Sequence, residues 1–348
     1  MIRVRRPLFT LVAILGCATL GNEAPFPAPV QTSGAGPFRR LDRYETGIPG
    51  SPVGRAAMLA GATTGGMFVS GYLFYVEAPP KAEPPERDQG LAPDEVDWAQ
   101  FEPRRILRAP SRPADLGHDG GVEVLRASEG WEGGGVYDPW VVADEEGRAV
   151  LYYAGDGGIG IATAPSLDGE WTRMAGPIVP DARSPSVVPA PDGGWLMYFE
   201  SAEGIGVARS RDGVSFTELT RTLDLSAPTP ATEPAERSVR RPGAVTVTTP
   251  TGRLLVRLYF ESLREDGTRA IGFAASEDGV TFERRPGSVY DEDDPGAPAP
   301  FVDAEGRTRL YLTVDARLRG TDLVTRALVM AVAPPWERYA PLPEDEAE

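Results

Sequence analysis

Short apolar runs bounded by turn residues recur in a fixed order along the C-terminal part of the chain. Each repeat opens with a residue followed by proline and then by apolar residues, a pattern that predicts a short strand. Successive copies are 46, 57 and 58 residues apart, which indicates one repeated structural unit. The four copies are Asp138-Pro139-Trp140-Val141-Val142, Ser184-Pro185-Ser186-Val187-Val188, Arg241-Pro242-Gly243-Ala244-Val245 and Ala299-Pro300-Phe301-Val302.

Further elements follow each opening strand. An aromatic-rich run comes next, and three copies continue into an Ile-Gly-x-Ala element and an Asp-Gly pair. Asp-Gly between apolar runs favours a hairpin, because both residues accept positive φ, so the third and fourth strands of each unit are expected to pair antiparallel. The glycine of Ile-Gly-x-Ala suits a strand that is crowded against a neighbouring unit. These glycines are Gly160, Gly206 and Gly272, and the turns are Asp168-Gly169, Asp212-Gly213 and Asp278-Gly279.

The repeats predict an all-β fold, a five-bladed β-propeller. Four strands in about 50 residues make a blade that cannot bury both faces alone, so the copies must stack around an axis. Four clear blades are expected over 111–340, before an acidic tail at 341–348. A fifth, irregular blade is expected over 51–110, with 51–53 as its inner strand, 67–76 as its second and 98–107 as its outer strand. Four blades plus an extension is the competing count.

The first 17 residues have the features of an export signal peptide. Arg3, Arg5 and Arg6 precede an uncharged run at 7–21 that is too short to span a bilayer. Within it, Ile14-Leu15-Gly16-Cys17 resembles a bacterial lipobox, whose Cys is lipid-modified after cleavage. We therefore expect an exported lipoprotein of the bacterial cell envelope, held at a membrane through Cys17, with 18–50 as a linker into the propeller. An ordinary cleaved signal is the alternative, and it implies export too.

A second uncharged stretch, at 56–76, is long enough to cross a membrane. Its glycines, hydroxyl residues and tyrosines dilute the hydrophobicity, and Gly65-Gly66 interrupts the run. Strands are therefore the favoured interpretation and a transmembrane helix the alternative. The acidic, proline-rich stretch at 77–97 is expected to be a solvated insert.

Composition narrows the cofactors and partners. The chain of 348 residues has one Cys and one His, which excludes an internal disulfide and metal centres rich in His and Cys. We expect no cofactor. Calcium at Asp291-Glu292-Asp293-Asp294 is the alternative to a solvated acidic loop, and His118 is expected to be a loop residue without a role. The formal net charge of -16 argues against nucleic acid as a partner and is compatible with a sugar.

The order of these elements resembles the five-bladed propeller glycosidases of the arabinanase, xylosidase and invertase group, glycoside hydrolase families 43 and 32. The resemblance covers 137–339. It implies three acids at the mouth of the central funnel, near the starts of three inner strands. The first is a base or nucleophile, the third donates a proton to the leaving group, and the second adjusts the pKa of that proton donor. The matching positions in this chain are Asp138, Ser184 and Arg240, so two of the three acids are absent.

Other side chains near these positions are candidates for a site. Arginine does not deprotonate and serine carries no charge, so hydrolysis by the usual three acids is not expected. Glu200 and Glu261, in matching Tyr-Phe-Glu-Ser sequences at the ends of second strands, are secondary catalytic candidates beside Asp138. The favoured interpretation makes them partners of the nearby arginines. Trp140 is expected either to fill the core or to stack on a sugar ring. The candidate ligand-binding residues are Tyr137, Trp140, Arg183, Ser184, Arg240 and Arg241.

Three functions are compatible with these residues. The first is carbohydrate binding in the funnel by a catalytically degenerate relative of glycosidases. The second is atypical glycoside hydrolysis by Asp138 with Glu200 or Glu261. The third is a surface scaffold that binds another protein, because a propeller alone does not decide function.

Overall fold

The computed structural model describes ten segments of the chain. They are residues 38–40, 66–69, 72–77, 104–110, 121–143, 148–226, 233–249, 252–302, 308–317 and 324–332. The signal peptide with Cys17, the acidic insert at 77–97 beyond its first residue, His118 and the tail at 341–348 lie outside these segments.

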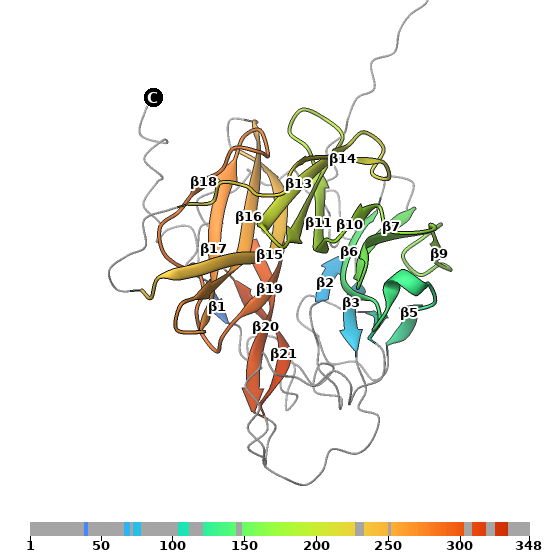
Figure 1. Cartoon of the computed structure of the whole chain (residues 1–348), viewed down its shortest axis with the longest axis horizontal. Coiled ribbons are helices and arrows are strands. Elements are labelled where there is room, and N and C mark those ends of the chain that lie inside the picture. Colours follow the sequence, from blue (N-terminus) through green and yellow to red (C-terminus); the bar gives the residue numbers. More distant parts are fainter. Residues whose placement is uncertain are drawn as a thin grey trace, which may run out of the picture.

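The described residues form five antiparallel sheets, which we number as blades 1 to 5 (Figure 1). Blade 1 has β2 (Gly66–Val69), β3 (Tyr72–Glu77), β4 (Arg105–Pro110) and β5 (Val122–Arg126). Blade 2 has β6 (Tyr137–Ala143), β7 (Ala149–Gly155) and β8 (Gly158–Ala164), with β9 (Thr172–Arg173) and β10 (Val179–Pro180) both paired to β8. Blade 3 has β11 (Arg183–Pro189), β12 (Trp195–Ser201), β13 (Gly204–Ser210) and β14 (Phe216–Thr220). Blade 4 has β15 (Glu236–Thr248), β16 (Leu254–Arg264), β17 (Arg269–Ser276) and β18 (Glu283–Arg284). Blade 5 has β19 (Gly296–Val302), β20 (Thr308–Arg317), β21 (Val324–Val332) and β1 (Arg39–Arg40).

The inner strands of the five blades form a closed ring. Each is in contact with the next, in the order β2, β6, β11, β15, β19 and back to β2. Figure 1 shows these strands around the middle of the molecule. The expected all-β, five-bladed propeller is therefore confirmed. The last blade also joins the two ends of the propeller, because β1, from the N-terminal side of the chain, pairs with β21 as the outer strand of blade 5.

Blade 1 differs from the expected strand assignment. The run at 67–76 is not one strand: β2 and β3 form a hairpin in which Val69 pairs with Tyr72. Ser70-Gly71 lies between them in the sequence and suits a tight two-residue turn. The inner strand is thus β2 and not 51–53, which lies outside the described residues, and the blade extends past residue 110 to β5.

The same hairpin bears on the second uncharged stretch. Over 66–69 and 72–76 that stretch is a strand pair, so the transmembrane alternative is wrong for this part of it. Among the residues that the structure describes, no helix has the length and hydrophobicity needed to cross a bilayer.

Aromatic side chains join each blade to the next. Tyr152 of β7 donates a 2.5 Å hydrogen bond to the Gly213 carbonyl, in the Asp-Gly turn of blade 3, and packs edge-on against Phe216. In the same way, the Tyr198 hydroxyl of β12 donates a 2.8 Å hydrogen bond to the Gly279 carbonyl, in the Asp-Gly turn of blade 4. The Asp-Gly turns therefore close the expected hairpins and also accept hydrogen bonds from the tyrosines of the neighbouring blade.

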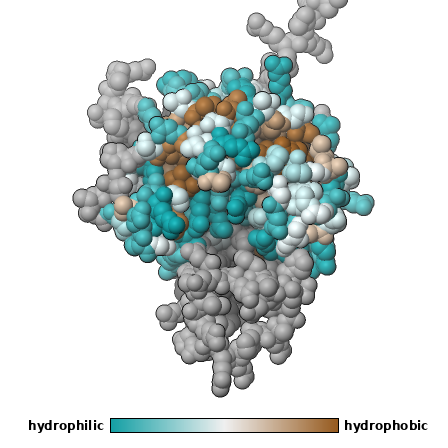
Figure 2. All heavy atoms as spheres, in the orientation of Figure 1, coloured by the Kyte–Doolittle hydropathy of each residue, from teal (hydrophilic) through white to brown (hydrophobic). Residues whose placement is uncertain are grey.

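On the face of the molecule that Figure 2 shows, apolar residues are visible in patches between hydrophilic ones.

The glycines of the Ile-Gly-x-Ala element have a different role from the expected one. Gly206 pairs across the sheet with Phe199 of its own blade, and a Cβ at Gly206 would lie 2.5 Å from two atoms of the Phe199 ring. Gly272 faces Phe260 in the same way. At Gly206 and Gly272 the crowding thus comes from the aromatic residue directly opposite on the second strand. At Gly160 the nearest atom belongs to Trp131, which precedes blade 2, and Tyr153 on the second strand is the next.

Candidate functional site

The start of four inner strands has an unusual backbone conformation. One non-glycine residue in each has a positive φ of 48–51° and precedes a proline. In each case the pairing with the second strand shifts register at this point, so the residue and its proline form a bulge. Bulges re-aim side chains, and a positive φ costs about 1–3 kcal/mol per residue, so these positions are where strain concentrates. The four residues are Asp138, Ser184, Arg241 and Ala297.

This geometry corrects the fourth copy of the repeat. Ala299-Pro300 was expected to match Asp138-Pro139, but the register shift in β19 lies between Gly296 and Ala299, and Ala297 has the positive φ. The copy is therefore Ala297-Pro298. The sequence does not distinguish Ala297-Pro298 from Ala299-Pro300, because the two Ala-Pro pairs are adjacent. In the structure, only Ala297-Pro298 forms the bulge.

Asp138 and Ser184 meet between blades 2 and 3. The Ser184 hydroxyl donates a 2.7 Å hydrogen bond to Oδ2 of Asp138. Ser184 is buried and Asp138 is half-buried. Tyr137 is also buried, with its hydroxyl donating to the Gly155 carbonyl at 3.2 Å, and the Arg104 guanidinium lies 3.7 Å from its ring centroid. Asp138 is therefore the solvent-facing member of this group.

Glu200 joins blade 3 to blade 4. Its Oε2 accepts a 3.1 Å hydrogen bond from the backbone N–H of Arg241, and its Oε1 lies 3.8 Å from Nε of Arg183. Burial raises the pKa of Glu200. The Arg241 and Arg183 guanidiniums oppose this shift, and the carboxylates of Asp138 and Glu261 add to it. Glu200 is thus a carboxyl group that holds its proton more tightly than usual.

Glu261 is held very differently. Its side chain is fully buried; Oε1 accepts a 2.5 Å hydrogen bond from Nε of Arg240, and Oε2 lies 3.6 Å from Arg241 and accepts from the Ala297 N–H at 3.4 Å. Burial alone would raise its pKa, but Arg241, Arg240 and Arg269 outweigh burial, so the pKa is lowered. Glu261 is therefore an ionised anchor, as the favoured interpretation of these glutamates expected.

These contacts form one continuous arc across the blades, which we call the mouth ring. It runs from Arg104 through Tyr137 and Asp138 to Ser184 and Arg183, then through Glu200, Arg240, Arg241 and Glu261 to Ala297. The residues come from all five blades or the segments that lead into them. The site residues expected at the funnel are thus brought together, apart from Trp140.

Trp140 lies below the mouth ring. It is 7% exposed, belongs to the hydrophobic core, and its indole N–H donates to the Val187 carbonyl at 2.8 Å across to blade 3. This geometry favours the core interpretation of Trp140 over the sugar-stacking one.

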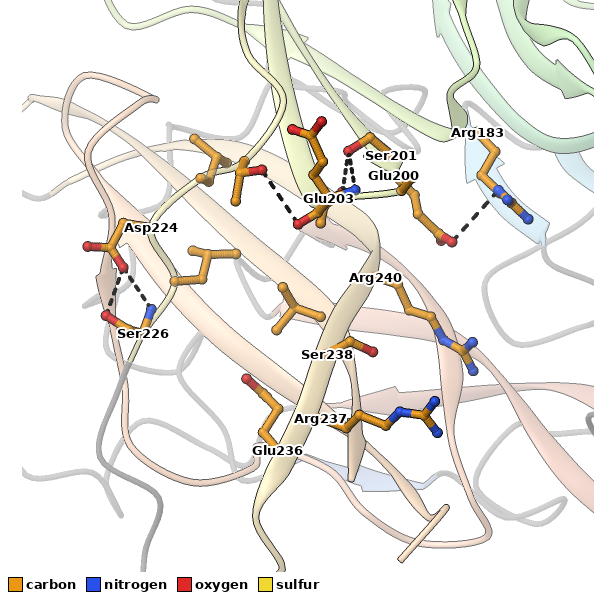
Figure 3. Close-up of a pocket in the computed structure, with 16 residues that line it drawn as sticks. Arg183, Glu200, Ser201, Glu203, Asp224, Ser226, Glu236, Arg237, Ser238 and Arg240 are labelled. Carbon is orange, nitrogen blue, oxygen red and sulfur yellow. Dashed lines mark hydrogen bonds and ion pairs between the residues drawn. The ribbon is translucent and has the colours of Figure 1, made fainter. Parts of the chain in front are cut away.

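A groove opens beside the mouth ring, between blade 3 and the first residues of β15 (Figure 3). Its volume is about 720 Å³, within the range of small-molecule sites. Arg183, Glu200 and Arg240 line it and belong to the mouth ring as well. Sequence reasoning missed Arg237 and Ser238, which also line it, because no repeat places a residue there.

One residue of the acidic run before blade 5, Asp294, is paired with an arginine. Asp294 binds the guanidinium and the backbone N–H of Arg269. Within the described segments, no group of three or more His, Cys, Asp or Glu side chains is arranged to hold a metal ion.

Comparison with known proteins shows similarity in structure only. No protein-family model matches the chain, and no curated protein matches its sequence. An endo-arabinase from Bacteroides thetaiotaomicron VPI-5482 has a TM-score of 0.52 and 14% identity, over 80% of this chain and 95% of its own. The GH43_1 enzyme from Xanthomonas citri, solved with xylotriose, has a TM-score of 0.51 and 18% identity, over 79% and 88%. A sucrose-6-phosphate hydrolase from Lactobacillus gasseri has a TM-score of 0.55 and 14% identity, over 78% and 57%. The chain thus has the fold of the propeller glycosidases, as its repeats indicated.

Proposed function

We propose that this protein binds carbohydrate at the mouth of its propeller and does not hydrolyse it by the usual three acids. The observation that carries the proposal is the mouth ring, in which strained residues of neighbouring inner strands contact one another, as Ser184 does with Asp138. Strained backbone that the surrounding structure maintains is typical of functional sites. The likeness to carbohydrate-active propellers supports the choice of ligand class.

The chemistry of the ring suits sugar hydroxyls. Asp138 is half-buried and offers a carboxylate acceptor, and Arg183 is exposed and offers several N–H donors. Charge-assisted hydrogen bonds of this kind are about twice as strong as neutral ones. Ser184 and Arg240 cannot act as an acid pair, which is why binding is favoured over turnover by the usual route.

The test is calorimetric titration of the mature protein with a panel of neutral and acidic oligosaccharides. Asp138→Asn keeps the shape and removes the charge, and it is expected to weaken binding about tenfold, the equivalent of one charge-assisted hydrogen bond. The matched control is Asp266→Asn, in an exposed turn where Asp266 bonds Thr268. Unchanged affinity in the Asp138 variant, or no binding by any oligosaccharide, would overturn the proposal.

A second candidate is hydrolysis by Asp138 with Glu200 as the acid. The raised pKa of Glu200 favours it, because a general acid must keep its proton near the working pH. Glu261 is less suited, since it is buried and ionised. Release of reducing sugar that falls by about 100-fold or more in Glu200→Gln, with binding retained, would support this candidate. No release by the unaltered protein would remove it.

We also propose export and lipid attachment at Cys17, on the basis of the basic head, apolar run and lipobox-like sequence. A single acyl group binds membranes only marginally, whereas lipoprotein modification adds several chains. Cys17→Ser is expected to move the protein from the membrane fraction to the soluble fraction of cell extracts. An unchanged distribution would contradict attachment at this residue.

A further inference from the structure

In the part of the chain that the structure describes, the inner strand of blade 4 begins earlier than those of blades 2, 3 and 5, and we call this extension the wall. β6, β11 and β19 begin one residue before their positive-φ residue, whereas β15 begins at Glu236, five residues before Arg241. Four extra residues in a strand add about 13 Å of length, at about 3.3 Å per residue. β16 is longer as well: it ends at Arg264, which pairs with Glu236 at the start of β15. This extension rises beyond the mouth ring and forms one side of the groove.

The groove is continuous with the mouth ring. Its lining on blade 3 includes Arg183 and Glu200, and its lining on blade 4 includes Arg240. A ligand bound beside Asp138 therefore has room to extend past Arg183 into the groove with its next sugars. The volume of about 720 Å³ can hold more than one sugar ring.

A bulge in the wall re-aims one arginine. The register of β15 shifts between Glu236 and Ser238, which leaves Arg237 as the extra residue. Figure 3 shows that the Arg237 and Arg240 side chains leave β15 on the same side, the side on which Arg183 lies. Arg237 is exposed, and within the described segments it makes no ion pair. Arg183 is 62% exposed, and its one ion pair among the described residues is the 3.8 Å contact with Glu200.

Four acidic residues line the groove: Glu200 lies beside Arg183, Glu203 is exposed, and the other two are bound elsewhere. Glu236 accepts two 2.7 Å hydrogen bonds from Arg284, and Asp224 accepts from the Ser226 hydroxyl at 2.7 Å and from its backbone N–H at 3.1 Å. Figure 3 shows both on the far side of β15 from the arginine side chains. The side of the groove next to the mouth ring is thus the one where guanidinium groups are exposed.

We propose that the groove binds the continuation of an acidic oligosaccharide whose carboxylates pair with Arg237 and Arg183. This rests on the proposed function, because the same chain of sugars occupies the mouth. A guanidinium matches a carboxylate in a planar, bidentate geometry, which a neutral hydroxyl cannot use in full. The net charge of -16 does not oppose this in physiological salt, since charges more than about 8 Å apart are largely screened there.

The experiment is calorimetric titration of the mature protein with tetragalacturonate and with a neutral galactose tetramer, at pH 7 and 150 mM NaCl. We expect the acidic tetramer to bind at least tenfold more tightly than the neutral one. Arg237→Gln is expected to lose about tenfold in affinity for the acidic tetramer and little for the neutral one. The control is Arg253→Gln, because Arg253 is an exposed arginine paired with Glu277 and does not line the groove.

The outcomes separate this inference from the proposed function. Equal affinity for the two tetramers, with weakening by Asp138→Asn and none by Arg237→Gln, would overturn the acidic ligand and leave carbohydrate binding standing. Absence of binding by both tetramers, and by the wider panel, would overturn both. Arg237 is exposed, so its variant is expected to fold, and an unchanged melting temperature would verify this.

Discussion

The two glutamates of the mouth ring allow a sharp test of its electrostatics. They lie in identical Tyr-Phe-Glu-Ser sequences, so Glu261→Gln and Glu200→Gln are matched substitutions. Glu261 is fully buried beside Arg240 and Arg241, whose side chains are 28% and 30% exposed. Removing one partner of a buried ion pair costs about 3–5 kcal/mol. Because the two arginines keep some water, we expect the lower end, about 3 kcal/mol at pH 7, for Glu261→Gln.

The two variants are expected to differ in the sign of their pH dependence. The folded-state pKa of Glu261 is lowered, so its stabilisation is complete above the ordinary value of 4.5 and is lost as the pH falls through the folded-state pKa. The deficit of Glu261→Gln therefore closes in acid. The folded-state pKa of Glu200 is raised, so the unaltered protein loses stability as the pH rises from 4.5 through that pKa. Relative to it, Glu200→Gln gains stability over the same rise.

The measurement is thermal unfolding of both variants and the unaltered protein from pH 8 down to about pH 2, so that the scan passes below the ordinary glutamate pKa of 4.5. At about 2–4 °C per kcal/mol for a domain of this size, Glu261→Gln is expected to melt about 6–12 °C lower at pH 7. Equal losses in the two variants, or parallel pH profiles, would refute the assignment of opposite pKa shifts.

Two further predictions concern the backbone. Gly206→Ala places a Cβ 2.5 Å from the Phe199 ring and 2.9 Å from the Thr220 carbonyl oxygen. We expect it to lower the free energy of unfolding in urea by about 1–3 kcal/mol. The control is Gly130→Ala, which has open space around it and is expected to change that free energy little. Ala297→Gly relieves a positive φ of 48° and is expected to leave stability unchanged or raise it by up to about 1 kcal/mol, and a loss of more than 1 kcal/mol would show that the conformation is not strained.

The sequence was sufficient for the architecture where the repeat carries its own turn chemistry. Asp212-Gly213 and Asp278-Gly279 predicted hairpins that the structure contains, because the turn depends on residues next to one another in the chain. Blade 1 was harder to predict, although an Asp-Gly pair, Asp119-Gly120, lies between β4 and β5 in its sequence. Its first two strands are joined at Ser70-Gly71, inside an uncharged run that periodicity alone could not divide.

The candidate site could be located from sequence but not interpreted. The prolines predicted that Asp138, Ser184 and Arg241 occupy equivalent positions in successive blades, and all three have a positive φ at a bulge. The identical local sequences around Glu200 and Glu261 hide opposite environments, because one glutamate faces the Arg241 N–H from the next blade and the other faces two guanidiniums. Such differences arise from the residues on the facing strand of the same blade and from contacts with the next blade, about which the local Tyr-Phe-Glu-Ser sequence carries no information.

Arg240 occupies the position where the resemblance to propeller glycosidases implies an acid, and it pairs with Glu261. An arginine at this position needs a counter-charge, and Glu261, opposite it on β16, supplies one at 2.5 Å. Arg240→Glu restores the residue type that the resemblance puts there, yet it would place two carboxylates against each other, one of them fully buried. We expect it to cost at least about 3 kcal/mol at pH 7 and to yield no hydrolysis.

Protonation separates repulsion from lost packing as the cause of that cost. Two facing carboxyl groups can share one proton, so the deficit of Arg240→Glu is expected to shrink between pH 7 and pH 5. Adding Glu261→Gln to the same variant removes the repulsion and is expected to recover part of the stability at pH 7. If Arg240→Glu instead melts like the unaltered protein at pH 7, Glu261 does not depend on Arg240, and the mouth ring is not the coupled unit that its contacts imply.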